Sequence, residues 1–488
     1  MTQRLSKSRF VAGCQCYDFL WWKVHEPDAP EFVPDVALED RFEQGTEVGE
    51  RARTWFPGGV LIDLPHTAVD ERVQQTREAL EAKAPAIYEA TFVEDDVYVA
   101  VDVLERVDGG HNLIEVKSTT DVKEEHYPDA AVQTHVLRKA GIDVRRVDLM
   151  HLNKECRYPD LSNLFIRENV TPQVEEMLPG IPGQIAAQLE MLDGPFPGKG
   201  FGEHCLTASY CPFQERCFPD MSGDHVMTLH GVGPKKAWDL MQAGYHHISD
   251  LPPDHKLSKV NRRQLAALAK GGTVVEDSLG RALEPLVPPL AFLDFETVGR
   301  AIPVWDGCKP YEQVPAQFSC HVDPGDGQFA HHEWLADGRG DPREGLARAL
   351  VEVCKGARLI VTYNVGFERG RIRHLAEALP DLAPELEAID RRLFDLLPVV
   401  RNHVYHPAFE GSFSIKDVLP VLAPDLDYGS LDVSEGQVAS VLIGRLMLEP
   451  ERFDAEERTT LRRQLLEYCE LDTWAMVKLL QELTRLAQ

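Results

Sequence analysis

Two carboxylates and a lysine lie close together on two predicted strands in the first part of the chain. Asp102 lies near the end of the alternating segment 98–107, and Glu115 and Lys117 follow in LIEVKST, residues 113–119. Alternate residues of a strand face the same side, so Glu115 and Lys117 point into one site. Two carboxylates can hold Mg²⁺ or Mn²⁺, and a neighbouring lysine can orient the attacking water. This pattern predicts metal-assisted phosphodiester hydrolysis, although an E-x-K pair is also common on a plain solvated strand.

A second set of acids is spread over the last part of the chain. Asp294 and Glu296 share one face of a predicted strand, and Glu368 follows the next strand in YNVGFERG. Tyr468 and Asp472 are four residues apart, so they share one face of the predicted final helix. Carboxylates that converge in this way repel one another unless two divalent ions lie between them, which is the arrangement that cleaves phosphodiester bonds. Tyr468 is a weak base, and we expect it to position the water or the phosphate.

The cysteines form a third candidate site. Cys205, Cys211 and Cys217 have the spacing C-x5-C-x5-C, while Cys14 and Cys16 lie near the start of the chain. Four thiolates can bind a [4Fe–4S] cluster or Zn²⁺, but the C-x2–4-C pairs that zinc sites usually use are absent here. In a reducing cytoplasm such a group predicts metal ligation before disulfides, and four unrelated buried thiols are the alternative.

Composition sets limits on the function. The chain has 488 residues with 51 Lys and Arg against 79 Asp and Glu, a net charge of -28, which argues against a protein that coats nucleic acid by bulk charge. It does not exclude a metal-dependent nuclease, because the ions that the carboxylates hold meet the phosphates. No apolar run reaches the ~18 residues of a membrane span, and MTQRLSKSRFVAG lacks the apolar stretch of a secretory signal, so we expect a cytoplasmic protein without a membrane partner.

Proline- and glycine-rich joints divide the chain into three expected domains, 1–220, 221–285 and 286–488. Hydrophobic periodicity predicts an α/β pattern in the first and third of them. The expected helices cover 42–56, 128–141 and 456–487, and the expected strands cover 98–107, 113–119, 144–153, 290–296 and 358–364. The middle segment is short and helical, and residues 228–270 carry seven Lys or Arg against three acids, so this stretch is locally basic.

The first domain resembles the RecB-like branch of the PD-(D/E)xK nucleases, which have a restriction-endonuclease-like fold. In that family a strand Asp and an E-x-K pair are followed by a helix that opens with Gln, as Asp102, Glu115, Lys117 and Gln133 are here. The resemblance implies that Gln133 assists catalysis. It also implies a metal ligand on an upstream helix, where Glu47 stands in place of the usual His.

The cysteines resemble the iron–sulfur site of RecB-like nucleases, in which a remote cysteine joins three clustered ones. Cys16 precedes YDFLWW, an aromatic helix start like that of the family, so the resemblance assigns Cys16 rather than Cys14 to the cluster. The family has two residues between two of its clustered cysteines, whereas five residues separate the corresponding cysteines here. The implied role of the cluster is structural.

The middle segment resembles a helix-hairpin-helix element through LHGVGPKKAWDLMQAG. Its glycine turn, with Gly231 and Gly233, would let backbone N–H groups approach phosphate oxygens, and Lys235 and Lys236 would add charged contacts. A plain helical linker is the alternative.

The last domain resembles the DnaQ-like (DEDD) 3′→5′ exonucleases of the tyrosine subtype, which have a ribonuclease H-like fold. The family motifs D-x-E, N-x-x-F-[D/E] and Y-x-x-x-D occur here in order. The second motif usually ends in Asp, so Glu368 is one methylene longer, and Asp395 is an alternative acid.

The order of the parts resembles a bacterial family defined by a domain of unknown function, family 2779. We therefore expect a DNA nuclease with two metal-dependent centres in DNA repair, phage defence or mobile-element processing. Single-stranded DNA or DNA ends are the favoured substrate, RNA is a second one, and a helicase is a candidate partner. A nucleic-acid-binding scaffold with inactive centres and an iron–sulfur sensor are the alternatives.

Overall fold

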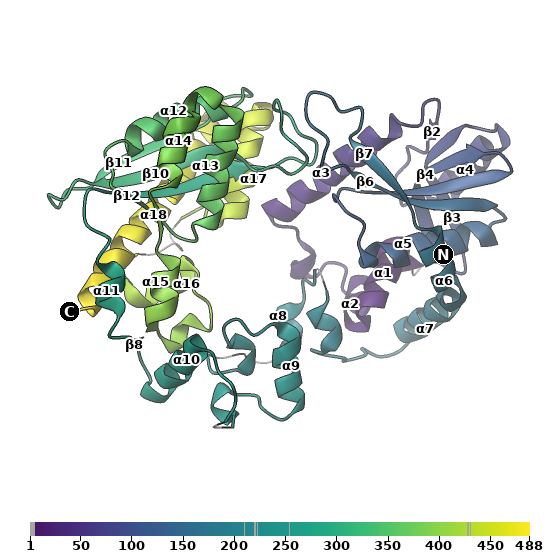
Figure 1. The fold of residues 1–488 in the computed structure, drawn as a ribbon. Helices are drawn as coiled ribbons and strands as arrows, with labels where there is room; N and C mark the ends of the chain where they lie inside the picture. The colour runs from purple at the N-terminus through teal and green to yellow at the C-terminus, as the bar shows by residue number, and fades with distance from the viewer. Residues whose placement is uncertain are drawn as a thin grey trace. The chain divides into compact units, whose positions relative to one another are not determined.

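The protein is described here by a computed structural model that covers residues 5–208, 210–218, 221, 223–252, 254–426, 429 and 431–488. The chain divides into two compact units (Figure 1). Unit 1 comprises Met1–Pro219 and Arg300–Tyr311, and unit 2 comprises Asp220–Gly299 and Glu312–Gln488. Helices and sheets are mixed in both units, as the α/β prediction requires. The finer division into three domains stays a prediction.

Unit 1 is built around a mixed sheet. Its strands are β1 (Leu5–Ser6), β2 (Val60–Leu61), β3 (Ala86–Glu94), β4 (Val97–Val107), β5 (Gly110–Lys117), β6 (Val144–Leu152) and β7 (Phe165–Asn169). Its helices are α1 (Lys7–Gln15), α2 (Tyr17–His25), α3 (Val36–Arg53), α4 (Val69–Glu81), α5 (Tyr127–Lys139), α6 (Thr171–Met177), α7 (Ile181–Asp193) and α8 (Gln214–Cys217). The strand order is β2-β3-β4-β5-β6-β7, and β1 pairs with β4. β4 and β5 are antiparallel neighbours, which brings Asp102 next to Glu115.

The two faces of this sheet are covered by different helices. One face carries the larger core, to which α1, α4, α5, α6 and α7 contribute apolar side chains. The other face packs against α3 through Val48 and Ala52. Glu115 and Lys117 alternate with the strand residues that face α3, so they lie on the α1 and α5 side of the sheet.

A segment from far along the sequence completes unit 1. Residues 300–311 lie between two strands of unit 2 in the sequence, yet Ala301 and Ile302 are buried in the core beside α3. The amide of Ala301 donates to Gln44 Oε1 at 2.6 Å, and the amide of Tyr158 donates to the carbonyl of Cys308 at 3.0 Å. Sequence periodicity did not indicate this exchange, because the segment forms no helix or strand of its own.

Unit 2 contains a second sheet and most of the remaining helices. Its strands are β8 (Val274–Val275), β9 (Leu290–Val298), β10 (Val314–Asp323), β11 (Ala330–Leu335), β12 (Leu359–Thr362), β13 (Leu393–Asp395) and β14 (Val404–Tyr405). Its helices are α9 (Pro234–Gln242), α10 (Lys259–Lys270), α11 (Leu279–Leu283), α12 (Arg343–Cys354), α13 (Gly366–Ala378), α14 (Ala383–Asp390), α15 (Leu397–His403), α16 (Ile415–Leu422), α17 (Gly436–Leu448) and α18 (Ala455–Leu486). β8 and β14 form a separate antiparallel pair.

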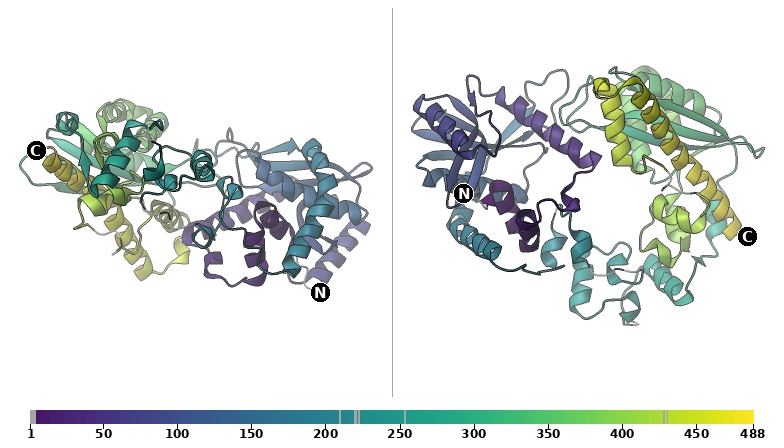
Figure 2. Two further views of the ribbon diagram at one scale, coloured as in Figure 1. Left: turned by 90° about the horizontal axis from the view of Figure 1, so that it is seen from below. Right: turned by 180° about the vertical axis from the view of Figure 1, so that it is seen from behind.

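The main sheet of unit 2 has the order β11-β10-β9-β12-β13. β9 is antiparallel to β10 and parallel to β12, so it is the central strand. Its alternate residues face two cores: Leu293 and Phe295 pack with α12, α13 and α14, while Leu290 and Phe292 pack on the side of α18. Helices α12–α14 lie over one face (Figure 1), and α18, drawn in yellow, runs along the other (Figure 2).

Helix α18 begins where the sequence provides a capping box. The Asp454 side chain accepts hydrogen bonds from the amides of Glu456 and Glu457, and the Glu457 side chain accepts one from the Asp454 amide. Ten of its side chains are buried in the described structure, at the helical spacing of one apolar face. This packing, rather than helix propensity, holds Tyr468 and Asp472 against the sheet.

The locally basic middle segment lies in unit 2. Val226, Leu229 and Ile248 form a small core around α9. The following helices join the main core of the unit, to which Ala267 of α10 and Leu279 of α11 contribute. In the described part of the chain, no helix is long and apolar enough to cross a membrane.

The fold makes a direct prediction for Phe292, which is 1% exposed and lies two residues before Asp294 on the same face of β9. Phe292→Ala should lower the free energy of unfolding of unit 2 by about 3–5 kcal/mol, because it leaves a cavity between β9 and α18. Urea unfolding followed by circular dichroism measures this loss. Val287→Ala, at a side chain that is 54% exposed, serves as the control and should change stability by less than about 0.5 kcal/mol. A Phe292 variant as stable as that control would contradict the packing described here.

Candidate functional site

Three carboxylates of unit 2 come together where β9 meets α18. Asp294 and Glu296 project from β9, and Asp472 projects from α18. One oxygen atom of each lies within 4.8 Å of those of the other two. Mg²⁺ and Mn²⁺ prefer such oxygen ligands, and around one Mg²⁺ ion the ligand atoms lie up to about 4 Å apart. The three side chains therefore need only small movements to share one ion or a pair of ions.

Burial and mutual repulsion dominate the electrostatics of this cluster. Burial raises the pKa of Asp294 well above its usual value, and the charges of Asp472 and Glu296 raise it further. Burial and Asp472 raise the pKa of Glu296 in the same way, although Lys416 opposes this effect. A cation among the carboxylates would remove the repulsion, so the donor set fits divalent metal ions.

Glu368 lies in the first turn of α13, close enough to add to the repulsion on Asp294. Its side chain is 2% exposed, and its Oε2 atom has no hydrogen-bond partner among the described residues. Burial, assisted by Asp395, raises the pKa of Glu368 to about 8. A buried carboxyl oxygen without a donor is rare in proteins and fits an ion ligand. The alternative acid, Asp395, instead accepts hydrogen bonds from the amides of Asn364 and Leu397, both at 3.0 Å.

Tyr468 lies beside the carboxylates on α18. It is 2% exposed and hydrogen-bonded to Asp472, and burial followed by the charges of Asp472 and Glu296 raises its pKa above the usual value. Its hydroxyl also accepts a hydrogen bond from Lys416 Nζ at 3.2 Å, and the same ammonium lies 5.1 Å from the ring centroid. Tyr468 therefore stays protonated and can orient a ligand but cannot act as a base at neutral pH. No sequence motif contains Lys416, which reaches the cluster only through the fold.

In unit 1, the predicted residues Asp102, Glu115, Lys117 and Gln133 form one connected cluster. Lys117 Nζ lies 2.8 Å from Glu115 Oε1, and Gln133 Nε2 donates to Glu115 Oε2 at 2.8 Å. Asp102 Oδ2 accepts from the amide of Val116 at 2.7 Å. Two further residues that the motif did not include belong to the cluster. Asp129 lies 2.6 Å from Lys117 Nζ, and Lys7 reaches the cluster from α1.

Lys7 occupies the position between the two carboxylates where a metal ion would be expected. Its Nζ atom lies 3.4 Å from Asp102 Oδ1 and 3.1 Å from Glu115 Oε2. Among the described residues, the acids of this cluster do not form a trio with ligand atoms all within 4.8 Å. The pair of carboxylates fits one cation, but that cation would take the place of the Lys7 ammonium.

The charges of this cluster are largely paired. Burial, together with the Glu115 charge, raises the pKa of Asp102 to about 7, against the effect of Lys7 and Lys117. Burial also disfavours the charged form of Glu115, but the Lys117 and Lys7 ammonium groups outweigh it and lower the pKa of Glu115 below its usual range. Asp102 is therefore the carboxyl of this pair whose charge depends most on what lies next to it.

Glu47 pairs with a different part of unit 1. It lies on α3, which covers the opposite face of the sheet, and its Oε2 atom is 2.9 Å from Arg300 Nη2. The inserted segment 300–311 thus supplies its partner. The role of Glu47 as a metal ligand stays a prediction, and its position on the opposite face of the sheet from Glu115 does not support it.

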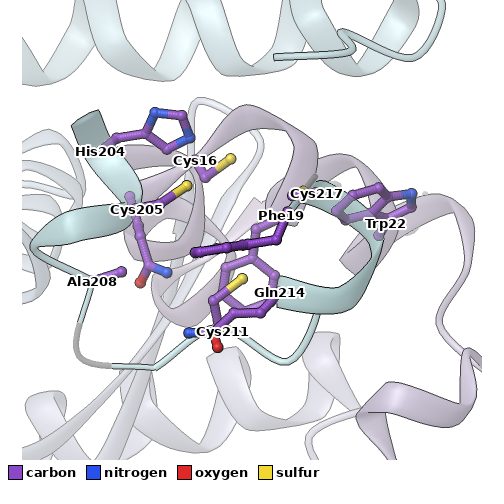
Figure 3. A pocket seen from close by; sticks show the side chains of 11 residues that line it. Cys16, Phe19, Trp22, His204, Cys205, Ala208, Cys211, Gln214 and Cys217 are labelled. Carbon is purple, nitrogen blue, oxygen red and sulfur yellow. The ribbon is translucent and has the colours of Figure 1, made fainter. Parts of the chain in front are cut away.

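The four predicted cysteines line one pocket of unit 1 (Figure 3). Cys16 lies between α1 and α2, Cys217 ends α8, and Phe19 of α2 lines the same pocket. Burial raises the pKa of Cys16 and Cys211, and it raises that of Cys217 to about 11, with Asp18 and Cys16 adding to the effect. Cys14 lies elsewhere, with its sulfur 3.7 Å from Gln188 Nε2. The pocket thus contains the four cysteines that the resemblance selected.

The spacing of the thiols bears on which metal group fits. Among the described residues, no three of the four sulfur atoms lie within 4.8 Å of one another. Four sulfurs around one Zn²⁺ at 2.3 Å would be separated by about 3.8 Å. The sulfur atoms are therefore farther apart than those of a closed zinc site.

Other contacts tie the two ends of this pocket together. Asp18 of α2 accepts hydrogen bonds from the amides of Lys199 and Gly200, at 3.0 and 2.9 Å. Arg216 of α8 pairs with Glu31 at 2.6 Å, and Phe213 is fully buried against the aromatic residues of α2. These contacts hold residues 199–200 and 213–216 against the first helical part of unit 1.

The glycine turn of the middle segment leads directly into α9. Gly231 has a φ of +71°, which a residue with a side chain rarely adopts, and Gly233 is the N-cap of the helix. Lys236 and Gly231 line a hollow that also contains Lys256 and Arg401. Lys235 is exposed, and its Nζ atom lies 3.9 Å from Asp239 Oδ1, one turn further along α9.

Comparison with known proteins concerns only part of the chain. Two curated bacterial proteins are similar to it, and both are described as uncharacterized. "Uncharacterized protein MG366 homolog" of Mycoplasma pneumoniae is 26% identical over 247 residues, which are 46% of this chain and 37% of that protein. "Uncharacterized protein UU173" of Ureaplasma parvum serovar 3 is 25% identical over 213 residues, which are 38% of this chain and 30% of that protein. The chain therefore spans about a third of the length of the curated relatives it matches.

No solved structure matches the chain. A family model does match, over residues 291–414, and its description is "Domain of unknown function (DUF2779)". The matched range contains Asp294, Glu296 and Glu368 and ends before α18. Through residues 291–414, the chain is similar to this family of unknown function.

Proposed function

We propose that the protein is a metal-dependent nuclease whose C-terminal centre trims 3′ ends of DNA. The observation that carries this proposal is the cluster of Asp294, Glu296 and Asp472, with buried Glu368 beside it. A contribution to folding stability does not explain why several carboxylates share one buried site, because each carboxylate raises the free-energy cost of ionising the others. Hydrolysis of phosphodiesters by divalent ions does explain it.

The sheet of unit 2 supports the proposal. Counted from β9, its order is 3-2-1-4-5, and β9 is antiparallel to β10 but parallel to β12. This is the arrangement expected of a ribonuclease H-like, DnaQ-like exonuclease domain. The acids also lie where that resemblance requires them, on the first strand, after the fourth strand and on the final helix.

Each residue then has a role in the C-terminal centre. Divalent ions held by Asp294, Glu296, Glu368 and Asp472 would supply activation of water and stabilisation of the leaving oxygen. Tyr468, which stays protonated, positions the water or the scissile phosphate. Lys416 keeps the Tyr468 hydroxyl in place and lies close enough to offset negative charge on a phosphate.

We assign a second, RecB-like centre to unit 1. Asp102 and Glu115 would hold a cation, Lys117 would orient water, and Gln133 fixes Glu115 by a hydrogen bond. For this centre to bind a metal ion, Lys7 must leave the position between the two carboxylates. A DNA phosphate could draw Lys7 away, because the ammonium would exchange one anionic partner for another.

The cysteine pocket and the middle segment complete the proposal. Cys16, Cys205, Cys211 and Cys217 would hold a [4Fe–4S] cluster that ties the end of unit 1 to its first helices. The turn at Gly231 and Gly233, with Lys235 and Lys236, would grip a DNA backbone without reading its sequence. DNA with a free or single-stranded end is the proposed substrate, with RNA as a second one, and a helicase remains a proposed partner.

The salt bridges of Lys7 favour one alternative for unit 1. If the ammonium stays between Asp102 and Glu115, this unit binds nucleic acid without cleaving it, and only the C-terminal centre is catalytic. An iron–sulfur sensor is a further alternative for the cysteine pocket. The experiments below separate these alternatives.

Two variants should separate the two centres. Asp294→Ala should lower 3′-end trimming at least ~100-fold, because several kcal/mol of metal-dependent stabilisation are lost, and should leave cleavage by unit 1 unchanged. Lys117→Ala should do the reverse. The measurement is degradation of single- and double-stranded DNA, labelled at either end, with Mg²⁺ or Mn²⁺.

Exposed residues that carry the same charge provide the controls. Glu377→Ala on α13 and Lys123→Ala remove comparable charges away from both clusters and should not alter either activity. If Asp294→Ala still trims 3′ ends, the C-terminal assignment is wrong. If either Asp294→Ala or Lys117→Ala abolishes all activity, the model of two separate centres fails.

The cysteine pocket predicts a metal that depends on Cys217 but not on Cys14. Protein purified without oxygen should be brown and contain iron, and Cys217→Ser should lose most of the iron and the visible absorbance. Cys14→Ser should keep both, because its sulfur lies outside the pocket. Zinc in place of iron would overturn the cluster assignment, and equal metal content in the two variants would overturn the ligand set.

Removal of Lys7 should strengthen metal binding in unit 1. In an Asp294→Ala background, Lys7→Met should tighten Mn²⁺ binding by about tenfold or more, since a unit charge at 4 Å is worth about 4 kcal/mol at an effective dielectric constant of 20. Isothermal titration measures the affinity, and Lys123→Met is the matched control. Unchanged or weaker Mn²⁺ binding would show that Asp102 and Glu115 do not hold the ion.

A further inference from the structure

A second group of potential ligands lies on the same sheet and helix as the carboxylate cluster of unit 2. His321 belongs to β10, His331 to β11 and Glu470 to α18. One ligand atom of each lies within 4.8 Å of those of the other two. The two histidines face each other in the β10–β11 pairing, with ring centroids 4.6 Å apart. None of these residues belongs to the motifs that predict nuclease activity.

Hydroxyl groups hold one nitrogen of each histidine ring. His321 Nδ1 lies 2.8 Å from Thr473 Oγ1, and His331 Nε2 lies 2.9 Å from Ser319 Oγ. The two hydroxyls are themselves 2.8 Å apart. Thr473 can donate its only hydroxyl proton to the Glu470 carbonyl at 3.0 Å, which leaves its oxygen to accept from His321 and Ser319. Each ring then carries its N–H on the hydroxyl side.

This arrangement leaves a lone pair on the other nitrogen of each ring. Those atoms are His321 Nε2 and His331 Nδ1, and the latter lies 3.6 Å from Glu470 Oε1. Metal-ligating histidines almost always donate their second ring N–H to a partner that fixes the tautomer, as Thr473 and Ser319 would do here. Two ligand atoms of a tetrahedral Zn²⁺ at 2.0–2.1 Å are separated by about 3.3 Å, so the observed 3.6 Å needs little adjustment.

We propose that His321, His331 and Glu470 bind a divalent transition metal ion of the Zn²⁺ type, separately from the ions of the carboxylate cluster. Two imidazoles and one carboxylate are a common donor set for zinc, whereas the all-oxygen set of Asp294, Glu296 and Asp472 suits Mg²⁺ or Mn²⁺. Glu470 has a side chain that is 48% exposed, and that of His331 is 22% exposed, so the ion can enter from solvent. A fourth position stays open to water or a ligand.

An ion at this site would link three elements of unit 2. It joins β10, β11 and α18, and Glu470 is two residues from Asp472 on the same helix. Ser319, which supports His331, is the register partner of Asp294. An ion bound here clamps α18 onto the sheet beside the carboxylate cluster.

Zinc titration of the full chain tests the proposal. With Mg²⁺ in excess, so that the oxygen sites are filled, competition against a fluorescent zinc chelator should reveal one Zn²⁺ equivalent that His331→Ala and Glu470→Gln remove. Thr473→Val should weaken the same equivalent by about 10–100-fold, because it deletes the hydroxyl that orients His321 without deleting a ligand. Zn²⁺ should also raise the thermal unfolding temperature of the wild-type chain more than that of His331→Ala.

The control is His332→Ala, which removes an exposed neighbouring histidine on the opposite face of β11. It should bind zinc like the wild type, and circular dichroism without zinc should show that all four variants are folded. The same zinc stoichiometry and affinity in wild type and His331→Ala would overturn the proposal. Equal loss in His332→Ala would overturn it as well, because binding would then follow surface histidine content.

Discussion

The repulsion between buried carboxylates is the constraint on which both proposed centres depend. In unit 2 burial and mutual repulsion raise the pKa of Asp294 and Glu296, and Lys416 offsets only part of this rise for Glu296. In unit 1 the lysines Lys7 and Lys117 neutralise a similar pair. The first arrangement favours binding of an external cation, while the second already contains its own. The two centres therefore differ in how readily a metal ion can enter.

The sheet of unit 2 explains how distant residues reach one place. β9 is the central strand, and on its face toward α18 the buried residues Leu290 and Phe292 precede Asp294 and Glu296. The apolar end of this face packs against α18, and that contact brings Asp472 toward β9. Packing thus stabilises the arrangement that charge repulsion opposes, and a bound ion would add its binding free energy to the stability of the native state. The same helix positions Glu470 for the proposed zinc site.

The sequence predicted those elements whose signals are local. The strand expected at 290–296 is β9, Leu290–Val298, and the helix expected at 456–487 is α18, Ala455–Leu486. The apolar run at 290–296 and the helical spacing at 456–487 are local patterns, so they indicate the elements without the fold. Contacts between residues that are far apart in the sequence could not be predicted in this way. Lys7 lies 95 residues from Asp102, and no spacing rule connects them. The partner of Glu47 is Arg300, on a segment whose place in unit 1 no periodicity indicates.

The chemistry of the donors suggests why one chain could keep several metal groups apart. Oxygen atoms gather at Asp294, Glu296 and Asp472, imidazole nitrogens lie at His321 and His331, and sulfur atoms lie in the cysteine pocket. Hard ions such as Mg²⁺ favour oxygen, zinc accepts imidazole with carboxylate, and iron–sulfur clusters are mostly held by thiolates. Raw affinity alone would let a strongly binding metal fill every site, whereas donor type and spacing discriminate among them.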